Sequence, residues 1–335
     1  MTNWLITGGC GFIGTNLISE LTKDPNNRIR VLDNLSTGCK DFLGKVTNFV
    51  DAGPDIDSPH WEDPVYLIEG DILSPQILNR CLPGTDIVVH LAANTGVGPS
   101  VENPLSDCNT NVIGTLNTLE AARHNSVKSF VFASSGAPLG EQVPPLNENL
   151  VPHPASPYGA SKLAGEGYCS AYYHSFGLNS VVLRFGNVYG GKSEMKDSVV
   201  AKFIKCALSD IPFEVYGNGE QTRDFIYVED LVRAICFAGT KRQIGGEIFQ
   251  IASSTETKIN EIIELMQKAL VAHGLPLAVV KYKEARVGDV KRNFSDTSKA
   301  KRILGWEPLD NLTTGFEKTI KYYVDKAREE TPYGY

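Results

Sequence analysis

Residues 7-TGGCGFIG-14 place glycines at positions 8, 11 and 14, between the apolar run 4-WLI-6 and an amphipathic pattern over 12–23. Glycines at this spacing let the backbone turn tightly and approach a pyrophosphate, which then meets the unpaired N–H groups of the following helix. A glycine turn can also serve packing alone. Here it follows a predicted strand and opens a predicted helix, which is typical of a dinucleotide-binding fold.

A carboxylate ends the second predicted strand, about twenty residues beyond the glycines. Asp33 follows the apolar run 29–32 and begins 33-DNLSTG-38, which contains no arginine. A carboxylate at this point accepts hydrogen bonds from an adenosine ribose and repels a 2′-phosphate. The sequence therefore predicts NAD rather than NADP as the cofactor.

Short β-branched runs alternate with helical patterns through the first half of the chain. Strands are expected at 4–7, 29–32, 65–69, 86–90 and 129–133, with helices at 12–23 and 104–124. This alternation is typical of a parallel sheet covered on both faces. The segment 39–64 is polar and rich in Pro, Gly and Asp, so we expect a long surface excursion there.

The pattern changes after the strand expected at 180–183. Short strands (213–215, 224–227, 247–250) mix with helices near 199–208, 228–238, 259–272 and 313–326. We therefore predict an α/β protein, with a Rossmann-type doubly wound parallel sheet and a smaller interleaved α/β substrate lobe. The lobe would lie over the carboxyl edge of the sheet, where ligands of open α/β sheets bind.

The composition excludes several classes of protein. The chain has 335 residues, with Lys+Arg 32 against Asp+Glu 39 and no basic run, so we expect no nucleic acid and no membrane partner. No apolar run is long enough to span a bilayer, and the N-terminus reads as a first strand rather than a signal peptide. The seven scattered cysteines lack a CxxC pair, which indicates reduced thiols in a cytoplasmic protein without a metal site.

A tyrosine and a lysine stand four residues apart in 154-PASPYGASKLAGEGYC-169. On a helix, Tyr158 and Lys162 would share one face, about 5–6 Å apart. A free phenol has a pKa of about 10, and a nearby ammonium favours its ionised form. Alone, such a pair is more often an ordinary surface contact, so its meaning depends on the rest of the chain.

Eight motifs occur in order over essentially the whole chain: TGGCGFIG, DNLSTG, GDI, HLAA, SPYGASK, RFGNVYG, RDFIYVEDL and ARVGDV. In this order they resemble the extended short-chain dehydrogenase/reductase family, in its nucleotide-sugar epimerase/dehydratase branch, and are most similar to UDP-hexose 4-epimerases. The resemblance implies an NAD-binding domain from residues 1–180 and 228–252 and a nucleotide-sugar-binding lobe from 181–227 and 253–330. It also implies a homodimer that pairs through the helices near 104–124 and 157–176.

The resemblance makes Tyr158 the catalytic acid/base and Lys162 the group that tunes it and holds the nicotinamide ribose. The ammonium and the positive nicotinamide ring would move the pKa of the phenol toward the working range. By register, Ser135 in 130-FVFASSGAPLG-140 holds the reacting oxygen of the sugar, and Ser134 packs or touches the cofactor. The alternative is that both serines merely end a strand.

The other expected site residues follow from the same motifs. The cofactor residues are Gly8, Gly11, Phe12, Ile13, Gly14, Asp33, Asn34, Asp71, Ile72, Leu91, Ala92, Ala93, Thr110, Ala133, Tyr158, Lys162 and Phe185. The substrate residues are Ser135, Asn187, Tyr216, Arg223, Arg286, Asp289 and Asn293. The two arginines would bind a diphosphate through their guanidinium forks, or alternatively make structural salt bridges. His90, inside an apolar run, is interpreted as a core histidine.

The residues after Ser135 bear on the reaction. In related dehydratases an Asp–Glu pair follows the catalytic hydroxyl, and in decarboxylases a Glu does, whereas here Gly136 and Ala137 follow. All these enzymes begin by oxidising C4 of the sugar with NAD. Without a further acid and base, the 4-keto sugar would rotate and be reduced again, which predicts a 4-epimerase. Leu139 replaces a tyrosine that is frequent in the family, so the sugar contacts of that loop stay open.

Two other functions remain possible. An NDP-sugar dehydratase or reductase with its acid and base elsewhere would release a keto sugar or consume NADH. A non-enzymatic NAD(P)-sensing regulator could share the fold, although such proteins characteristically lack the YxxxK pair. The sugar also stays open among UDP-glucose, its N-acetylated form and its uronate. Asn293 stands where some epimerases carry a bulky aromatic, so it would leave room for an acetamido group.

Overall fold

The structure is a computed structural model that describes residues 1–52, 61–196, 198–285 and 290–330. Its central sheet has eight strands in the order β12-β7-β6-β5-β1-β2-β4-β3, and every pairing is parallel. The strands are β1 (Thr2–Thr7), β2 (Asn27–Asp33), β3 (Val50–Asp51), β4 (Val65–Glu69), β5 (Ile87–His90), β6 (Ser129–Ser135), β7 (Ser180–Phe185) and β12 (Ile248–Ile251). The predicted doubly wound parallel sheet is confirmed.

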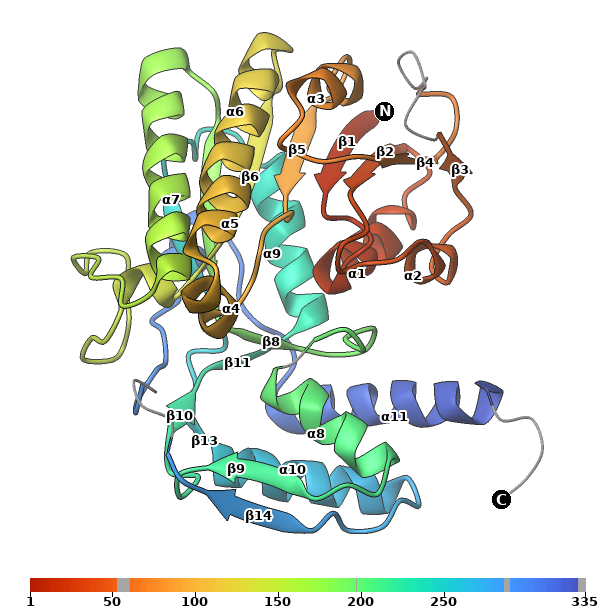
Figure 1. Cartoon of the computed structure of the whole chain (residues 1–335). Coiled ribbons are helices and arrows are strands. Elements are labelled where there is room, and N and C mark those ends of the chain that lie inside the picture. Colours follow the sequence, from red (N-terminus) through yellow and green to blue (C-terminus); the bar gives the residue numbers. More distant parts are fainter. Residues whose placement is uncertain (53–60, 197, 286–289, 331–335) are drawn as a thin grey trace.

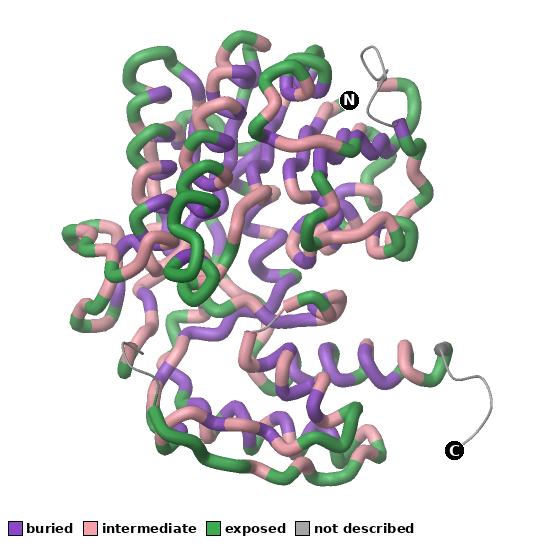
Figure 2. Tube along the Cα trace, viewed as in Figure 1, coloured by how far each residue is buried: buried purple, intermediate pink, exposed green. Residues whose placement is uncertain are grey.

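Both faces of the sheet are covered by helices, and each face has its own hydrophobic core (Figures 1 and 2). Successive strand residues point to opposite faces, so Trp4 and Ile6 enter one core and Leu5 the other. The helices on one face are α3 (Pro75–Cys81), α6 (Gly114–His124) and α7 (Pro157–Phe176), and those on the other are α1 (Phe12–Leu21) and α9 (Val228–Thr240). The near-continuous apolar strands follow from this two-sided burial.

Two predicted segments differ in the structure. The helix expected at 104–124 consists of α5 (Pro104–Cys108), a π-helical segment (Asn109–Ile113) and α6. Within the segment, the amide of Asn111 donates to Asn94, Asp107 and Ser161, which draws this stretch toward the interior. The surface excursion predicted at 39–64 contains α2 (Lys40–Gly44) and the edge strand β3, whose weak apolar patterns gave no signal.

A second lobe lies beneath the sheet in Figure 1. Its strand pairs are β8 (Asn187–Tyr189) with β11 (Phe225–Tyr227), β9 (Phe213–Tyr216) with β14 (Val280–Lys283), and β10 (Thr222–Arg223) with β13 (Thr257–Lys258). Its helices are α8 (Val199–Leu208), α10 (Ile259–Ala272) and α11 (Leu312–Glu330). The predicted domain division remains a prediction, but its boundary at 180/181 would divide β7, so the first part extends at least to Phe185.

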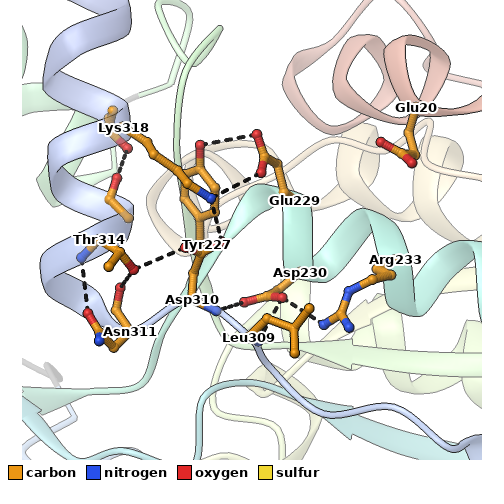
Figure 3. Close-up of polar contacts among 12 residues, drawn as sticks. Glu20, Tyr227, Glu229, Asp230, Arg233, Leu309, Asp310, Asn311, Thr314 and Lys318 are labelled. Carbon is orange, nitrogen blue, oxygen red and sulfur yellow. Dashed lines mark hydrogen bonds and ion pairs between the residues drawn. The ribbon is translucent and has the colours of Figure 1, made fainter. Parts of the chain in front are cut away.

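A polar cluster fastens α11 to the rest of the molecule (Figure 3). The buried Asp230 carboxylate, on α9, accepts hydrogen bonds from the backbone N–H groups of Leu309 and Asp310, both at 2.9 Å. Lys318 on α11 bridges to Glu229 and Asp310. The segment leading into α11 is thereby fixed against α9.

In the described parts of the chain, no helix is long and apolar enough to cross a membrane.

Candidate active site

A cavity of about 890 Å³ opens at the carboxyl edge of the sheet. The strand order reverses between the neighbours β1 and β5, because the chain adds β2, β4 and β3 on one side and β6, β7 and β12 on the other. Ligands of open α/β sheets bind at such a switch point. The loops that follow β1, β2, β5 and β6 all contribute to the lining of the cavity.

The glycine loop brings its backbone unusually close to the loop after β5. Gly8 has φ +71°, and a Cβ there would lie 2.7 Å from the backbone nitrogen of Ala92. A side chain would therefore be both strained and obstructed. Gly11 caps α1 without a side-chain hydrogen bond, and Phe12, at the start of that helix, lines the cavity. The N-terminus of α1 can thus receive an anion such as a pyrophosphate.

Asp33 ties the end of β2 to the glycine loop. Its carboxylate accepts hydrogen bonds from the N–H of Cys10 at 2.9 Å and the N–H of Leu35 at 2.8 Å. Burial raises the pKa of Asp33, and these two hydrogen bonds oppose that rise. Burial also raises the pKa of the Cys10 thiol far above its ordinary value, so this thiol stays protonated and is a poor nucleophile.

The glycine loop with the N-terminus of α1, called here the glycine cradle, and the Asp33 carboxylate fit a dinucleotide. All of the residues expected around the cofactor line the cavity, from the glycine loop to Phe185. Asn34 donates to Asp71 at 2.9 Å, which joins the ends of β2 and β4 beside the expected adenosine. The individual contacts of these residues with a cofactor remain predictions.

Local sequence sets Tyr158 and Lys162 at the start of α7. Ser156 accepts a hydrogen bond from the N–H of Gly159 at 3.1 Å, and Pro157 occupies the first helical turn, so the helix begins one residue before Tyr158. The Lys162 ammonium lies 6.0 Å from the centre of the Tyr158 ring. Both side chains line the cavity together with Ser135, which ends β6.

Lys162 is held by the sheet rather than by an acid. Its ammonium donates to the carbonyl oxygen of Ala133 at 2.9 Å and lies 5.0 Å from the centre of the Phe132 ring. Burial lowers the pKa of Lys162 to about 8. The group therefore loses its proton at a lower pH than an ordinary lysine, and an anion or a hydroxyl-rich ligand would favour the charged form.

The pKa of Tyr158 moves opposite to one expectation. Burial raises it above the ordinary value, and hydrogen bonding with the Ser135 side chain only partly opposes that rise. The expected lowering by Lys162 is therefore wrong for the protein alone, because desolvation of the phenolate is the larger effect. The other expected cause, the positive charge of a nicotinamide ring, remains a prediction.

A buried ion pair stands behind the two catalytic candidates. Glu166, one helical turn beyond Lys162, accepts hydrogen bonds from Arg184 Nε at 2.8 Å and Nη2 at 2.7 Å. Ser134 Oγ donates to the same carboxylate at 2.6 Å. Ser134 thus faces both the cavity and this ion pair, which links β6, β7 and α7 next to Ser135.

His90 has the role expected of a core histidine. It is 1% exposed, and its two ring nitrogens lie 2.9 Å from Thr7 Oγ1 and 3.1 Å from Thr115 Oγ1. Burial lowers its pKa to about 3, with a further contribution from Lys162. The ring is therefore neutral and fully bonded at the back of the site.

The expected substrate residues are not all brought together. Ser135 and Asn187 line the cavity, whereas Tyr216, Arg223 and Asn293 are not part of its lining as the described residues define it. Arg286 and Asp289 lie outside the described residues. Arg223 Nη1 donates to the carbonyl oxygens of Thr222 and Val290, both at 2.7 Å. The amide nitrogen of Asn293 lies 3.8 Å from where a Cβ on Gly136 would stand, so Asn293 is close to the Ser135 turn.

The cavity also contains residues that the sequence analysis did not assign. Most of these lie in three segments: Ser36–Gly38 after β2, Asn94–Pro99 after β5, and the stretch that leads into α8 and includes its first residues, namely Lys192, Met195, Lys196, Ser198, Val199 and Val200. The first could have been found from the small residues of DNLSTG. The lysines follow RFGNVYG directly, but an irregular loop has no periodicity that indicates which side chains face inward.

The glycine loop, Asp33 and the set Ser135, Tyr158 and Lys162 line one cavity, an arrangement typical of a Rossmann-type protein that binds a dinucleotide. Residues 4–252 match the NAD dependent epimerase/dehydratase family, and the chain belongs to this family.

Relatives cover nearly the full length of the chain. It is 34% identical to a putative UDP-glucose 4-epimerase of Methanocaldococcus jannaschii, over 97% of this chain and 99% of the relative. It is 32% identical to the UDP-glucuronate 4-epimerase of Thermodesulfobacterium geofontis, over 96% of each chain. The crystal structure of UDP-glucose 4-epimerase from Thermotoga maritima with UDP-glucose superposes with a TM-score of 0.86 at 34% identity, over 97% of this chain and 100% of that one.

Proposed function

We propose that the protein is an NAD-dependent nucleotide-sugar 4-epimerase, an isomerase that acts on a UDP-hexose. The observation that carries this proposal is the convergence of Tyr158, Lys162 and Ser135 on one cavity with the glycine cradle. The relatives named as UDP-sugar 4-epimerases support the same reaction.

The described residues suggest how the cofactor would be held. The N-terminus of α1 and the loop at Gly8 would receive the pyrophosphate, and Asp33 would accept from the adenosine ribose. Lys162 would donate to the nicotinamide ribose. When bound, NAD supplies the chemistry of oxidation and reduction at C4 of the sugar. Because the cofactor ends each cycle as it began, it would remain bound and be recycled.

The side chains near the reacting carbon divide the proton transfer between them. The backbone N–H of Ala137 donates to Ser135 Oγ at 3.1 Å, so the Ser135 hydroxyl hydrogen is available to the sugar oxygen or to Tyr158. Tyr158 would remove the proton of the C4 hydroxyl and later return it. Lys162 would favour the phenolate when a ligand keeps the lysine charged.

The lining of the cavity argues against elimination of water. The described lining contains only two carboxylates, Asp33 and Asp71, and both belong to the expected adenosine end. Gly136 and Ala137 occupy the positions where a dehydratase carries its acid pair. Among the described residues of the lining, a 4-keto sugar would therefore find no carboxyl pair for loss of the C6 oxygen, which favours reduction back to a hexose.

The experiment for this proposal uses purified protein without added cofactor. UDP-glucose, UDP-N-acetylglucosamine and UDP-glucuronate are incubated separately, and the anomeric protons are followed by NMR. A 4-epimer that approaches equilibrium supports the proposal, and the preferred sugar identifies the substrate. A 4-keto product, or turnover only after NADH is added, contradicts it in favour of the dehydratase or reductase.

We further propose that the protein is a homodimer. Apolar side chains are exposed along the outer helices in front of the sheet: Val97, Val101, Leu105, Ile113, Tyr168 and Phe176. Figure 2 shows much of α4 (Val97–Glu102) and α5 as exposed. Burial of such a surface stabilises association. Light scattering should give twice the 36.5 kDa of one chain, and the mass of one chain would contradict the dimer.

We also propose a cytoplasmic location, because all seven cysteines are free in the structure. Secreted proteins more often pair theirs. Cell fractionation with an antibody against the protein tests this directly, and recovery in a secreted fraction would contradict it.

A further inference from the structure

A buried carboxylate lies close to the catalytic candidates. Asp107, on α5, is 2% exposed. Its Oδ1 accepts a hydrogen bond from the Asn111 amide at 2.9 Å, whereas its Oδ2 has no hydrogen-bond partner among the described residues. A desolvated carboxylate is costly unless a positive charge compensates it, so a cation is expected within electrostatic reach of Asp107.

Hydrogen bonds join Asp107 to the helix that carries the catalytic candidates. The Asn111 amide that donates to Asp107 also donates to Ser161 Oγ at 3.1 Å. Ser161 directly precedes Lys162 on α7, and its hydroxyl donates to the carbonyl oxygen of Tyr158 at 3.0 Å. This network fixes the carboxylate in place relative to the Lys162 side chain.

The charge of Asp107 reaches Lys162. Burial lowers the pKa of Lys162 to about 8, and the Asp107 charge is the largest effect that opposes this lowering. Glu166 opposes it less, and its carboxylate is already paired with Arg184. Lys196 acts in the other direction, because it carries a like charge. Of the two described carboxylates that support the charge of Lys162, only Asp107 lacks an ion-pair partner of its own.

The other titratable groups around Lys162 are neutral near pH 7. Burial raises the pKa of the Cys169 thiol far above its ordinary value and lowers the pKa of His90 to about 3. The pKa of Tyr158 is raised by burial, and the Asp107 charge adds to that rise. Asp107 therefore opposes the phenolate directly, and any benefit it gives to the site must come through Lys162.

We propose that Asp107 is a positioning residue, the buried counter-charge that keeps the Lys162 ammonium protonated beside the nicotinamide ribose. It acts through Lys162, since it is not part of the cavity lining as the described residues define it. A charged Lys162 donates to ribose hydroxyls and favours the phenolate of Tyr158, whereas a neutral one does not attract the phenolate. The inference rests on the proposed function for the ribose and for the reaction.

The experiment measures the protonation of Lys162 directly. The full chain, saturated with NAD and carrying carbon-13 at lysine Cε, is titrated by NMR, and the Lys162 signal is identified by its loss in Lys162→Arg. Asp107→Asn removes the charge but keeps an oxygen that can accept from Asn111, and Asp107→Glu keeps the charge. Asp325→Asn, at an exposed pair with Arg328 on α11, is the matched control for the loss of one negative charge.

We expect Asp107→Asn to lower the pKa of Lys162 by about 0.5 or more, a threefold or larger loss of proton affinity, because the charge that opposes the effect of burial is gone. Asp107→Glu and the control should stay within about 0.2 of the unmutated protein. An unchanged pKa in Asp107→Asn, or an equal fall in Asp107→Asn and Asp107→Glu, overturns the inference, because a purely structural role does not depend on charge.

The unmutated protein supplies a test that needs no variant. The side-chain carboxyl carbon of Asp107 should follow the titration of Lys162, since two interacting groups report each other's protonation. A carboxyl signal that stays constant while Lys162 titrates would overturn the pairing.

Epimerase activity gives a separate readout. Activity should be lost as the pH rises through the pKa of Lys162, and Asp107→Asn should move this loss to lower pH. Because the NMR titration needs no turnover, a lowered Lys162 pKa in a protein without epimerase activity would contradict the proposed function alone. Epimerisation with an unchanged Lys162 pKa in Asp107→Asn would overturn the role of Asp107 alone.

Discussion

The ion pair behind the active site allows a sharp prediction about stability. Glu166 and Arg184 each have side chains that are 2% exposed, and the carboxylate accepts three hydrogen bonds from Arg184 and Ser134. Glu166→Gln removes the negative charge while keeping the shape and one oxygen acceptor. The Arg184 guanidinium, whose Nη1 has no hydrogen-bond partner among the described residues, is then left charged and buried beside an amide.

The expected cost follows from this geometry. Removing one partner of a buried ion pair typically destabilises a protein by about 3–5 kcal/mol, since the other charge stays desolvated. Replacing both partners by apolar residues of similar volume is often close to neutral. We therefore expect Glu166→Gln to lower the free energy of unfolding by about 3–5 kcal/mol, and a Glu166→Met/Arg184→Met double variant to recover at least half of the loss.

Urea denaturation, with the same excess of NAD for every variant, measures these free energies. Glu20→Gln is the control, because Glu20 pairs with Lys23 on the surface, where such pairs contribute at most about 1 kcal/mol. If Glu166→Gln unfolds within about 1 kcal/mol of this control, the reasoning about the buried charge is refuted.

Three further perturbations test other parts of the site. Gly8→Ala should reduce bound NAD per purified chain by about tenfold or more, because the new Cβ would lie 2.7 Å from the backbone nitrogen of Ala92. Absorbance at 260 nm measures the bound NAD, and full retention would contradict the assignment of this loop to the cofactor. His90 has its pKa lowered to about 3, below the unfolded value, so stability should fall with pH below about 6.5, by ~2 kcal/mol at pH 5. Urea denaturation should find this contribution absent in His90→Gln, and an unchanged pH dependence would argue against a neutral buried ring. Asn293→Tyr, next to the Ser135 turn, should depress turnover of UDP-N-acetylglucosamine more than that of UDP-glucose, and equal effects on both would mean that Asn293 does not determine which sugar is accepted.

Much of the first domain could be predicted because its signals are local. The glycine spacing shows where the backbone must approach a ligand, and Asp33 lies at the end of the next strand. The YxxxK spacing places Tyr158 and Lys162 on one face of a helix. Strands that are buried on both faces form short continuous apolar runs, which are easy to find in a sequence. For this reason β4 has the same bounds as its prediction, 65–69. Such features depend on few long-range contacts.

The parts that could not be predicted depend on tertiary contacts. The direction of the Tyr158 pKa shift is set by desolvation, which no sequence spacing reveals. Lys196 faces the cavity because Tyr323 and Lys326, some 130 residues later, hold its loop. The strand β14 was missed because three of its four residues are exposed and give no alternating pattern.

The most direct test of the central claim follows the hydrogen at C4. The preferred UDP-sugar from the NMR survey is prepared with deuterium at C4 and incubated with the holoenzyme in ordinary water. The account predicts that the 4-epimer forms with deuterium retained at C4, because oxidation and reduction occur at the same carbon on a cofactor that stays bound. Deuterium transferred to C6, exchanged into water or lost to added cofactor would contradict it.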